Sequence, residues 1–177
     1  ALRPLWKFIH RVLRNHKTFT LIGTPDTEEV ILNLLGKVLK DDELYLSGDY
    51  KAATDNIHSW VSEEVANAIS DELSLSEVER ELFIRSLTHH IFDTPSGLRE
   101  QKTGQLMGSI VSFPVLCIIN ASMCRWAMEL AEDKFKKLAD CALGVNGDDV
   151  ILKSKNSVYR FWHDITSFVG LEESIGK

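Results

Sequence analysis

The sequence predicts an α+β fold in which helices cover one face of a short antiparallel sheet. Three observations lead to this prediction. Several segments of the 177-residue chain place apolar residues three and four positions apart, as amphipathic helices do. A few short apolar runs with strand character lie between these helical segments, and two of the runs flank an Asn-Gly pair, which is typical of a β-hairpin. The hydrophobic content of 44% suffices for one core, so one domain, or a piece of a larger one, is expected.

Four helices are expected in the first half of the chain. Their ranges are residues 4–15, 23–42, 56–70 and 74–90. The first carries an Arg/Lys/His face, which is either a solvated helix surface or a contact for phosphate groups. The second is expected to be capped by Thr24 or Asp26 and to extend its apolar stripe to Val38. The fourth is expected to begin at Ser74 or Ser76, with a glutamate completing a capping box.

The other expected elements include the strands. In chain order they are a strand over 44–46, a hairpin turned at 95–97, a helix over 112–138, a hairpin over 142–153 and a helix over 158–169. The first strand breaks at Gly48, which leaves Asp49 at its end. Pro114 falls in the first turn of the long helix, where its missing N–H costs little. Gly170 is expected to close the last helix.

Charge and cysteine content limit the class of protein. The chain has 20 basic and 26 acidic residues, a net charge of −6. This argues against a free-standing nucleic-acid module, which needs a basic surface, but allows a catalytic core whose cations are metal ions. Cys117, Cys124 and Cys141 show no metal-ligand spacing and are expected to be buried, reduced thiols of an intracellular protein. No signal peptide is visible, and no apolar run is long enough to span a bilayer.

Two adjacent carboxylates lie in the stretch CALGVNGDDVILKS. An Asn-Gly pair between apolar runs predicts a type I′ turn, so residues 142–145 and 150–153 are expected to pair. Asp148 and Asp149 then lie at or beside the hairpin tip. Two carboxylates at a tight tip repel one another unless a cation or a basic partner compensates. The alternative is an ordinary solvated turn, because Asp is a common turn residue.

A separate acidic residue, Asp49, lies at the end of the strand expected over 44–46. If that strand lies next to the hairpin in one sheet, Asp49 and Asp148 converge and can hold two hard cations about 4 Å apart. Mg²⁺ keeps several waters and uses only one or two carboxylates together with substrate phosphates, so a pair of aspartates without His or Cys fits it. Such an arrangement is suited to phosphoryl transfer.

Three blocks in order, SGDYKAATDN, GQLMGSIVSFPVLCIIN and GVNGDDVILK, closely resemble motifs A, B and C of the palm domain of viral RNA-dependent RNA polymerases. The amino-acid sequence, including ALRPLWKFIH and GLEESIGK at the two ends, is most similar to those of ourmiavirus-like and narnavirus-like replicases. The resemblance implies a nucleotidyltransferase that makes RNA on a template during viral replication, with two Mg²⁺ ions, or Mn²⁺ as a substitute. It implies RNA template, nascent RNA and ribonucleoside triphosphates as partners, and the host cytoplasm, or alternatively the mitochondrion, as the compartment.

The resemblance also implies roles for single residues. Asp49 and Asp148 match the aspartates that bind both metals, and Asp149 matches a more peripheral ligand. Lys177 resembles a lysine that acts as general acid for the leaving pyrophosphate, the alternative being a solvated terminal lysine.

Further matching residues would contact nucleotide or RNA. Asp55 and Asn120 match the pair that senses the ribose 2′-hydroxyl, because an amide both donates to and accepts from a hydroxyl. The alternatives are a helix N-cap for Asp55 and an ordinary helix-face residue for Asn120. The motif B loop and the following helix supply four more candidates, Gly104, Gly108, Ser109 and Ser112.

Residues 1–177 are expected to form a single fragment of a larger polymerase, the palm with part of the fingers. The family places a basic fingers motif before this segment and a thumb after it, so the fragment alone is expected to be inactive. Two alternatives remain. One is a reverse-transcriptase-type palm, disfavoured because Thr54 and Asp55 lie where that family prefers an aromatic residue. The other is a non-catalytic, endogenised viral fragment.

Overall fold

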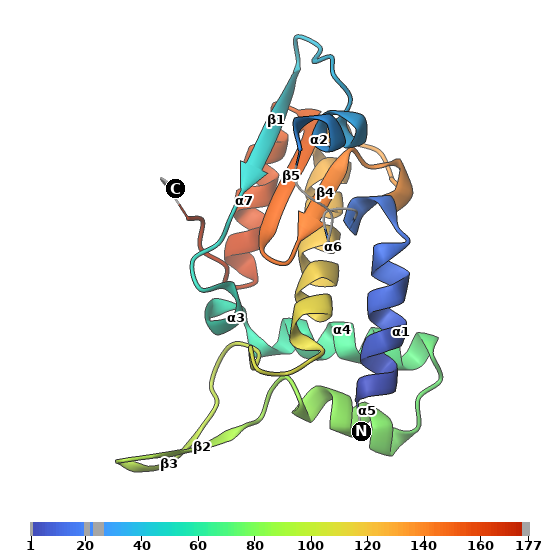
Figure 1. Ribbon diagram of the computed structural model, residues 1–177. Helices are drawn as coiled ribbons and strands as arrows, with labels where there is room; N and C mark the ends of the chain where they lie inside the picture. Colours follow the sequence, from blue (N-terminus) through green and yellow to red (C-terminus); the bar gives the residue numbers. More distant parts are fainter. Residues whose placement is uncertain (1, 20–21, 23–26, 175–177) are drawn as a thin grey trace.

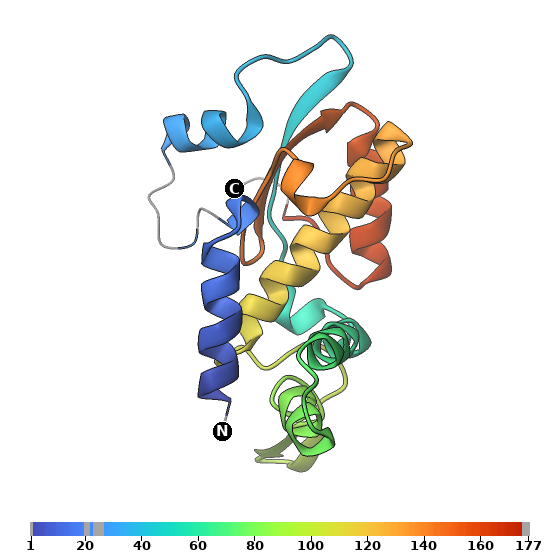
Figure 2. The same ribbon diagram turned by 90° about the vertical axis from the view of Figure 1, so that its right-hand side faces the viewer.

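The computed structural model describes residues 2–19, 22 and 27–174, and its centre is a three-stranded antiparallel sheet. The strands are, in order across the sheet, β1 (Glu43–Gly48), β5 (Asp149–Lys155) and β4 (Leu143–Asn146). Figure 2 shows α6 (Ser112–Glu132) and α7 (Val158–Phe168) on one side of this sheet, and α2 (Glu28–Leu35) on the other. The predicted α+β fold with a helix-covered antiparallel sheet is confirmed.

The remaining elements lie beside and below the sheet in the view of Figure 1. They are α1 (Arg3–Arg14), α3 (Ala53–Asn56), α4 (Ser59–Glu72), α5 (Glu77–Arg85) and the short 3-10 turns η1 (Lys17–Phe19) and η2 (Leu138–Asp140). A separate hairpin, β2 (Ile91–Thr94) and β3 (Gly97–Glu100), projects away from the body (Figure 1). In the described part of the chain, each helix is too short or too polar to cross a membrane.

One core joins the sheet to the helices behind it. Leu46 of β1 pairs with Leu152 of β5, which pairs in turn with Leu143 of β4, and all three are buried. Because successive side chains of a strand point to opposite faces, this register places the leucines on the face covered by α6 and α7. Burial of each leucine contributes about 1.5–3 kcal/mol of transfer free energy. The same alternation assigns the residues that flank each leucine in its own strand to the other face of the sheet.

The helix expected over 23–42 is shorter than the pattern predicted. It begins at Glu28, where the Thr27 hydroxyl accepts a hydrogen bond from the Val30 N–H at 3.3 Å. It ends before Gly36, whose φ of +84° cannot continue a right-handed helix. Val38, the last residue of the predicted stripe, is 75% exposed, so extending the stripe that far was wrong. The alternative caps Thr24 and Asp26 lie outside the described residues.

Other boundaries divide into confirmed and corrected ones. Ser76 caps α5 with a complete capping box, as expected. The long helix ends at Glu132 instead of 138, because Asp133 adopts a left-handed conformation and the Glu129 carboxylate takes the Lys136 N–H at 2.9 Å. The four-residue helix α3 had no pattern to predict it, since one turn is too short to show a period.

Candidate active site

Strand pairing brings the two acidic segments together, as the sequence predicted. Gly48, the last residue of β1, pairs with Val150 of β5, so the next positions, Asp49 and Asp149, adjoin at the same end of the sheet. Residues directly opposite in an antiparallel pair have Cβ atoms about 4.5–5.5 Å apart. Both aspartates line a cavity of about 800 Å³, which lies along β1 and the hairpin end. The cavity therefore has two carboxylates on one wall.

The hairpin turn differs by one residue from the prediction. Asn146 pairs with Asp149, so the two central residues are Gly147 and Asp148, not Asn146 and Gly147. Gly147 has φ of +69° while Asp148 stays at negative φ, which is the pattern of a turn with glycine at the first central position, not of a type I′ turn. The pairing of Asn146 in the ladder extends β4 and moves the turn. Asp148, half-buried, thus lies at the tip itself.

Asp49 is held by its own backbone neighbourhood. Its Oδ1 accepts a hydrogen bond from the Tyr50 N–H at 2.8 Å, and its carbonyl accepts one from the Ser174 N–H at 2.9 Å. On the preceding residue, an added Cβ at Gly48 would lie 2.7 Å from the Trp162 ring, so only glycine lets the ring pack there. The carboxylate at position 49 is therefore carried on a tightly fitted backbone.

Sequence reasoning missed a third acidic residue in the same cavity. Glu173 also lines this cavity. Its Oε2 accepts a hydrogen bond from the Tyr159 hydroxyl at 3.0 Å, and its Oε1 lies 2.6 Å from His163 Nδ1. The segment is fixed by a β-bridge between Glu173 and Tyr50. The Glu173 carboxylate raises the pKa of the Tyr159 hydroxyl, because only the protonated phenol can donate this hydrogen bond and because ionising a phenol beside an anion is unfavourable. The repeated acids of GLEES were the only signal that could have drawn attention to it.

Asn120 of α6 is fully buried and bonded to the hairpin. Its Nδ2 lies 3.1 Å from both the Gly147 and the Asp148 carbonyl oxygens, and its Oδ1 accepts from the Tyr50 hydroxyl at 3.0 Å. Asp55 lies exposed on α3, and no hydrogen bond joins it to Asn120 in the described structure. The Asp55 side chain does not cap α4, whose N-cap residue is His58 without a side-chain cap bond. The shared ribose-sensing role of the pair stays a prediction.

Tyr50 and Cys117 are buried groups beside the turn. Burial raises the pKa of the Tyr50 hydroxyl well above its usual range, with Cys124, Glu173 and Asp148 adding to the rise. Burial likewise raises the pKa of the Cys117 thiol to about 11, and its sulfur accepts the Gly147 N–H at 3.2 Å. Both groups are neutral at pH 7 and serve as hydrogen-bonding partners.

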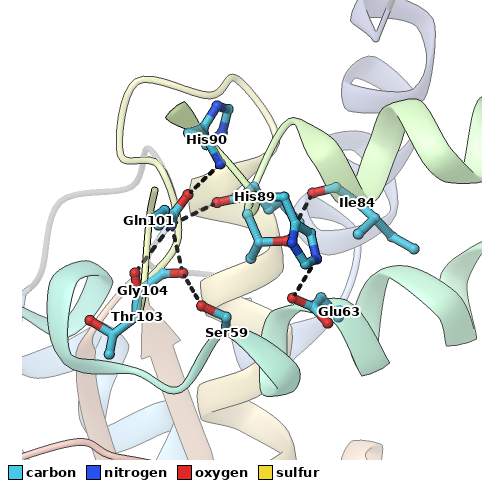
Figure 3. A network of polar contacts seen from close by, with 10 residues as sticks. Ser59, Glu63, Ile84, His89, His90, Gln101, Thr103 and Gly104 are labelled. Carbon is cyan, nitrogen blue, oxygen red and sulfur yellow. Dashed lines mark hydrogen bonds and ion pairs between the residues drawn. The ribbon is translucent and has the colours of Figure 1, made fainter. Parts of the chain in front are cut away.

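The loop over residues 101–111 holds Gly104, Gly108 and Ser109. It contacts α3, where the Thr103 hydroxyl donates to the Asp55 carbonyl at 3.0 Å, and α4 (Figure 3). The Gln101 amide donates to the carbonyls of Thr103 and Gly104, and the Ser59 hydroxyl donates to the Gly104 carbonyl. Gly104 has φ of +79°, and an added Cβ would lie 2.5 Å from the Thr54 carbonyl oxygen. The lack of a side chain at Gly104 thus serves protein packing.

The other loop candidates have different surroundings. Gly108 is exposed with open space around it, which leaves its backbone accessible to a ligand. Ser109 is half-buried, while Ser112, the first residue of α6, is buried and accepts from the Gln105 side chain through its carbonyl at 3.2 Å. Lys177 lies outside the described residues.

The donor set fits a hard divalent cation in number and kind. Within residues 2–19, 22 and 27–174, no group of three or more His, Cys, Asp or Glu side chains lies close enough together to form a complete metal cage. Mg²⁺ does not require one, because it takes one or two carboxylates and fills its other positions with water and substrate phosphate oxygens. Asp49 and Asp149, which line the cavity, supply such a set, and Asp148 lies in the adjoining turn.

Comparisons with known proteins point in one direction. No protein-family model matches the chain. Over 147 residues the chain is 39% identical to the RNA-dependent RNA polymerase of Ourmia melon virus (isolate Melon/Iran/VE9), covering 75% of the chain and 17% of that protein. The fold of the chain matches that of the BmCPV RNA-dependent RNA polymerase at elongation state, with a TM-score of 0.66 and 9% sequence identity. The match covers 96% of the chain and 17% of that polymerase.

Proposed function

We propose that this chain, a relative of the ourmiavirus RNA-dependent RNA polymerase, is the catalytic palm with part of the fingers of a polymerase that copies RNA in viral replication. The chain spans 17% of the length of that relative, so the activity belongs to the larger protein. The observation that carries the proposal is the register of β1 with β5, which places Asp49 beside the hairpin with Asp148 and Asp149.

The arrangement suits nucleotidyl transfer. Asp49 and Asp148 would hold two Mg²⁺ ions, with Asp149 as the more peripheral ligand, and Mn²⁺ could replace them. When bound, such ions lower the pKa of the attacking 3′-hydroxyl and neutralise charge on the leaving pyrophosphate. The chain itself fixes the carboxylates at the adjoining ends of β1 and the β4–β5 hairpin and offers the neighbouring cavity to the nucleotide. Lys177 is our proposed general acid for pyrophosphate.

The proposal is tested on the full-length polymerase with a single-stranded RNA template and Mg²⁺. We expect complementary RNA from the four ribonucleoside triphosphates, and little product when deoxyribonucleoside triphosphates replace them. Preferential use of the deoxyribonucleotides would indicate a reverse transcriptase instead. No product with either set, from protein that is folded, would favour a non-catalytic remnant.

Asp55 is the residue we propose to discriminate ribose from deoxyribose. It is exposed on α3, five residues past the β-bridge at Tyr50, so its carboxylate is available to a ligand. Replacing Asp55 by alanine removes an acceptor for the 2′-hydroxyl, and a site built to bind a hydroxyl discriminates through that bond. We expect the ratio of kcat/KM for ribonucleotide over deoxyribonucleotide to fall by about tenfold or more, since each 1.4 kcal/mol of a lost hydrogen bond is tenfold. An unchanged ratio would show that the role is misplaced.

We further propose that the basic face of α1 contacts RNA phosphates. The five basic residues of this helix form no ion pair with a described carboxylate; they are Arg3, Lys7, His10, Arg11 and Arg14. Trp6 and several of these cations line a shallow groove of about 460 Å³. A helix with four Lys or Arg residues, one histidine and no acid in a chain of net charge −6 concentrates positive potential on one surface.

Charge removal on α1 tests this contact. In the full-length polymerase, the triple change Lys7→Gln, Arg11→Gln and Arg14→Gln should reduce the slope of log K against log salt for single-stranded RNA. We expect a loss of about 0.7 per phosphate contact, or roughly two in total. The matched control removes three basic residues elsewhere, Lys134→Gln, Lys137→Gln and Lys155→Gln. Equal slopes in the two variants would contradict the proposal.

For the compartment, we propose the host cytoplasm, with the mitochondrion as the alternative. The three cysteines are free and buried, which is typical of proteins in a reducing environment.

A further inference from the structure

We propose that Tyr50, Asn120 and Trp162 form a buried hydrogen-bond chain that positions the backbone carrying Asp49 and Asp148, and that Asn120 acts through this chain and not on the ribose. The inference rests on the proposed function for its kinetic readouts.

The chain of bonds joins four separate parts of the sequence. The Trp162 Nε1–H of α7 donates to the Tyr50 hydroxyl oxygen at 3.1 Å, and the Tyr50 hydroxyl donates to Asn120 Oδ1 at 3.0 Å. Asn120 Nδ2 then donates to the carbonyl oxygens of Gly147 and Asp148, each at 3.1 Å. The Tyr50 and Trp162 ring centroids are 5.6 Å apart, so the two rings also pack together. One hydroxyl therefore lies at the junction of α7, α6 and the two acidic segments.

The orientation of the Asn120 amide follows from its partners. A backbone carbonyl can only accept, so the amide nitrogen must face Gly147 and Asp148, and the oxygen must face Tyr50. The oxygen also accepts from the Cys124 thiol at 3.5 Å. Both N–H groups and both acceptor sites of the amide are thereby engaged, and Asn120 is 0% exposed. A ribose hydroxyl would have to displace one of these buried bonds, which leaves a polar group without its partner.

The same side chains are bonded to the two backbone segments that carry Asp49 and Asp148. Tyr50 is covalently next to Asp49, and its N–H donates to the Asp49 carboxylate. The two carbonyls that Asn120 binds belong to the central residues of the turn, whose Gly147 N–H is bonded in turn to Cys117 of the same helix. Reacting groups displaced by about 1 Å can lose about a hundredfold in rate. A fixed hydroxyl between these segments is therefore suited to keep the carboxylates in register.

The kinetic test uses the full-length polymerase with Tyr50→Phe, which removes the hydroxyl and keeps the ring. We expect kcat to fall by about ten- to a hundredfold while KM for the nucleotide changes by less than about twofold, because alignment is lost and binding is not. Trp162→Phe should show the same split, and the double variant should be no worse than either single one, because all three lack the same chain. Unchanged kcat in Tyr50→Phe would overturn the proposal.

Asn120→Ala separates positioning from sugar recognition. Positioning predicts that kcat falls alike for ribo- and deoxyribonucleotides, so that the ratio of their kcat/KM values is unchanged. A fall of tenfold in this ratio would overturn the proposal and return Asn120 to the ribose. If the alanine variant fails to fold, Asn120→Ser takes its place, because a serine hydroxyl can donate to only one of the two carbonyls.

Hydrogen exchange gives a readout that does not depend on activity. We expect the backbone amides over residues 143–150 to exchange faster in Tyr50→Phe and Asn120→Ala than in the unchanged polymerase. Trp126→Phe is the matched control, since Trp126 lies on α6 outside the chain of bonds and is 48% exposed. If the polymerase made no RNA, the proposed function would fail, and this measurement would still decide the anchoring. Equal exchange in all variants would overturn it.

Discussion

Asp148→Ala in the full-length polymerase is expected to abolish nucleotide incorporation while leaving the fold nearly intact. The side chain lies at the hairpin tip, and the three hydrogen bonds that hold the turn use the Asp148 carbonyl and the Gly147 carbonyl and N–H, which alanine keeps. A metal at a transferring phosphoryl group contributes several kcal/mol of charge stabilisation, which corresponds to a loss on the order of a thousandfold or more. Primer extension measures the rate, and thermal melting measures the fold.

The matched control is Asp41→Ala. Asp41 is an exposed aspartate in the turn before β1, at the opposite end of that strand from Asp49, so its removal changes the net charge equally and leaves the site untouched. We expect wild-type incorporation from the control. Incorporation at the wild-type rate by folded Asp148→Ala would refute the metal assignment.

The carboxylate pair was predictable because its signals are local. A turn-forming glycine between apolar runs defines a hairpin from a few residues, and the acidic residues lie in the same short stretch of sequence. The sequence also required β1 to pair with the hairpin, and the register confirms that pairing, with Asp149 beside Asp49, and Asp148 in the adjoining turn. The shared role of Asp49 and Asp148 stays a prediction. The one-residue shift of the turn was not predictable, because Asn-Gly and Gly-Asp both supply residues that tolerate turn conformations.

The partners of Asn120 could not be read from the sequence. Tyr50 lies 70 residues away from Asn120 in the chain, and Trp162 lies 112 residues from Tyr50. Whether a polar residue on a helix faces a ligand or a buried tyrosine depends on how α6 and α7 pack behind the sheet, which no local pattern encodes. The same reason explains why Glu173 was missed, since its place in the cavity follows from a single β-bridge to Tyr50.

Gly104→Ala is expected to destabilise the fold strongly, because its neighbours are backbone atoms that cannot move aside. The new Cβ would lie 2.5 Å from the Thr54 carbonyl oxygen and 2.9 Å from that of Asp55, at a φ of +79°. The left-handed conformation costs alanine about 1–2 kcal/mol, and overpacking adds about 1–3 kcal/mol. We expect the free energy of unfolding of this domain to fall by about 2–5 kcal/mol, measured as a lower melting temperature of the full-length polymerase.

Gly108→Ala is the matched comparison and separates two uses of glycine in one loop. Its Cβ would meet no atom within 4 Å, so the expected change in stability is within about 0.5 kcal/mol. If the Gly108 backbone approaches nucleotide or RNA, as the sequence resemblance implies, a methyl group there should lower incorporation without lowering the melting temperature. The two variants should thus fail in different assays: Gly104→Ala in folding, and Gly108→Ala in incorporation. A wild-type melting temperature for Gly104→Ala would contradict the packing of the loop against α3, and with it the placement of Asp55 beside that loop.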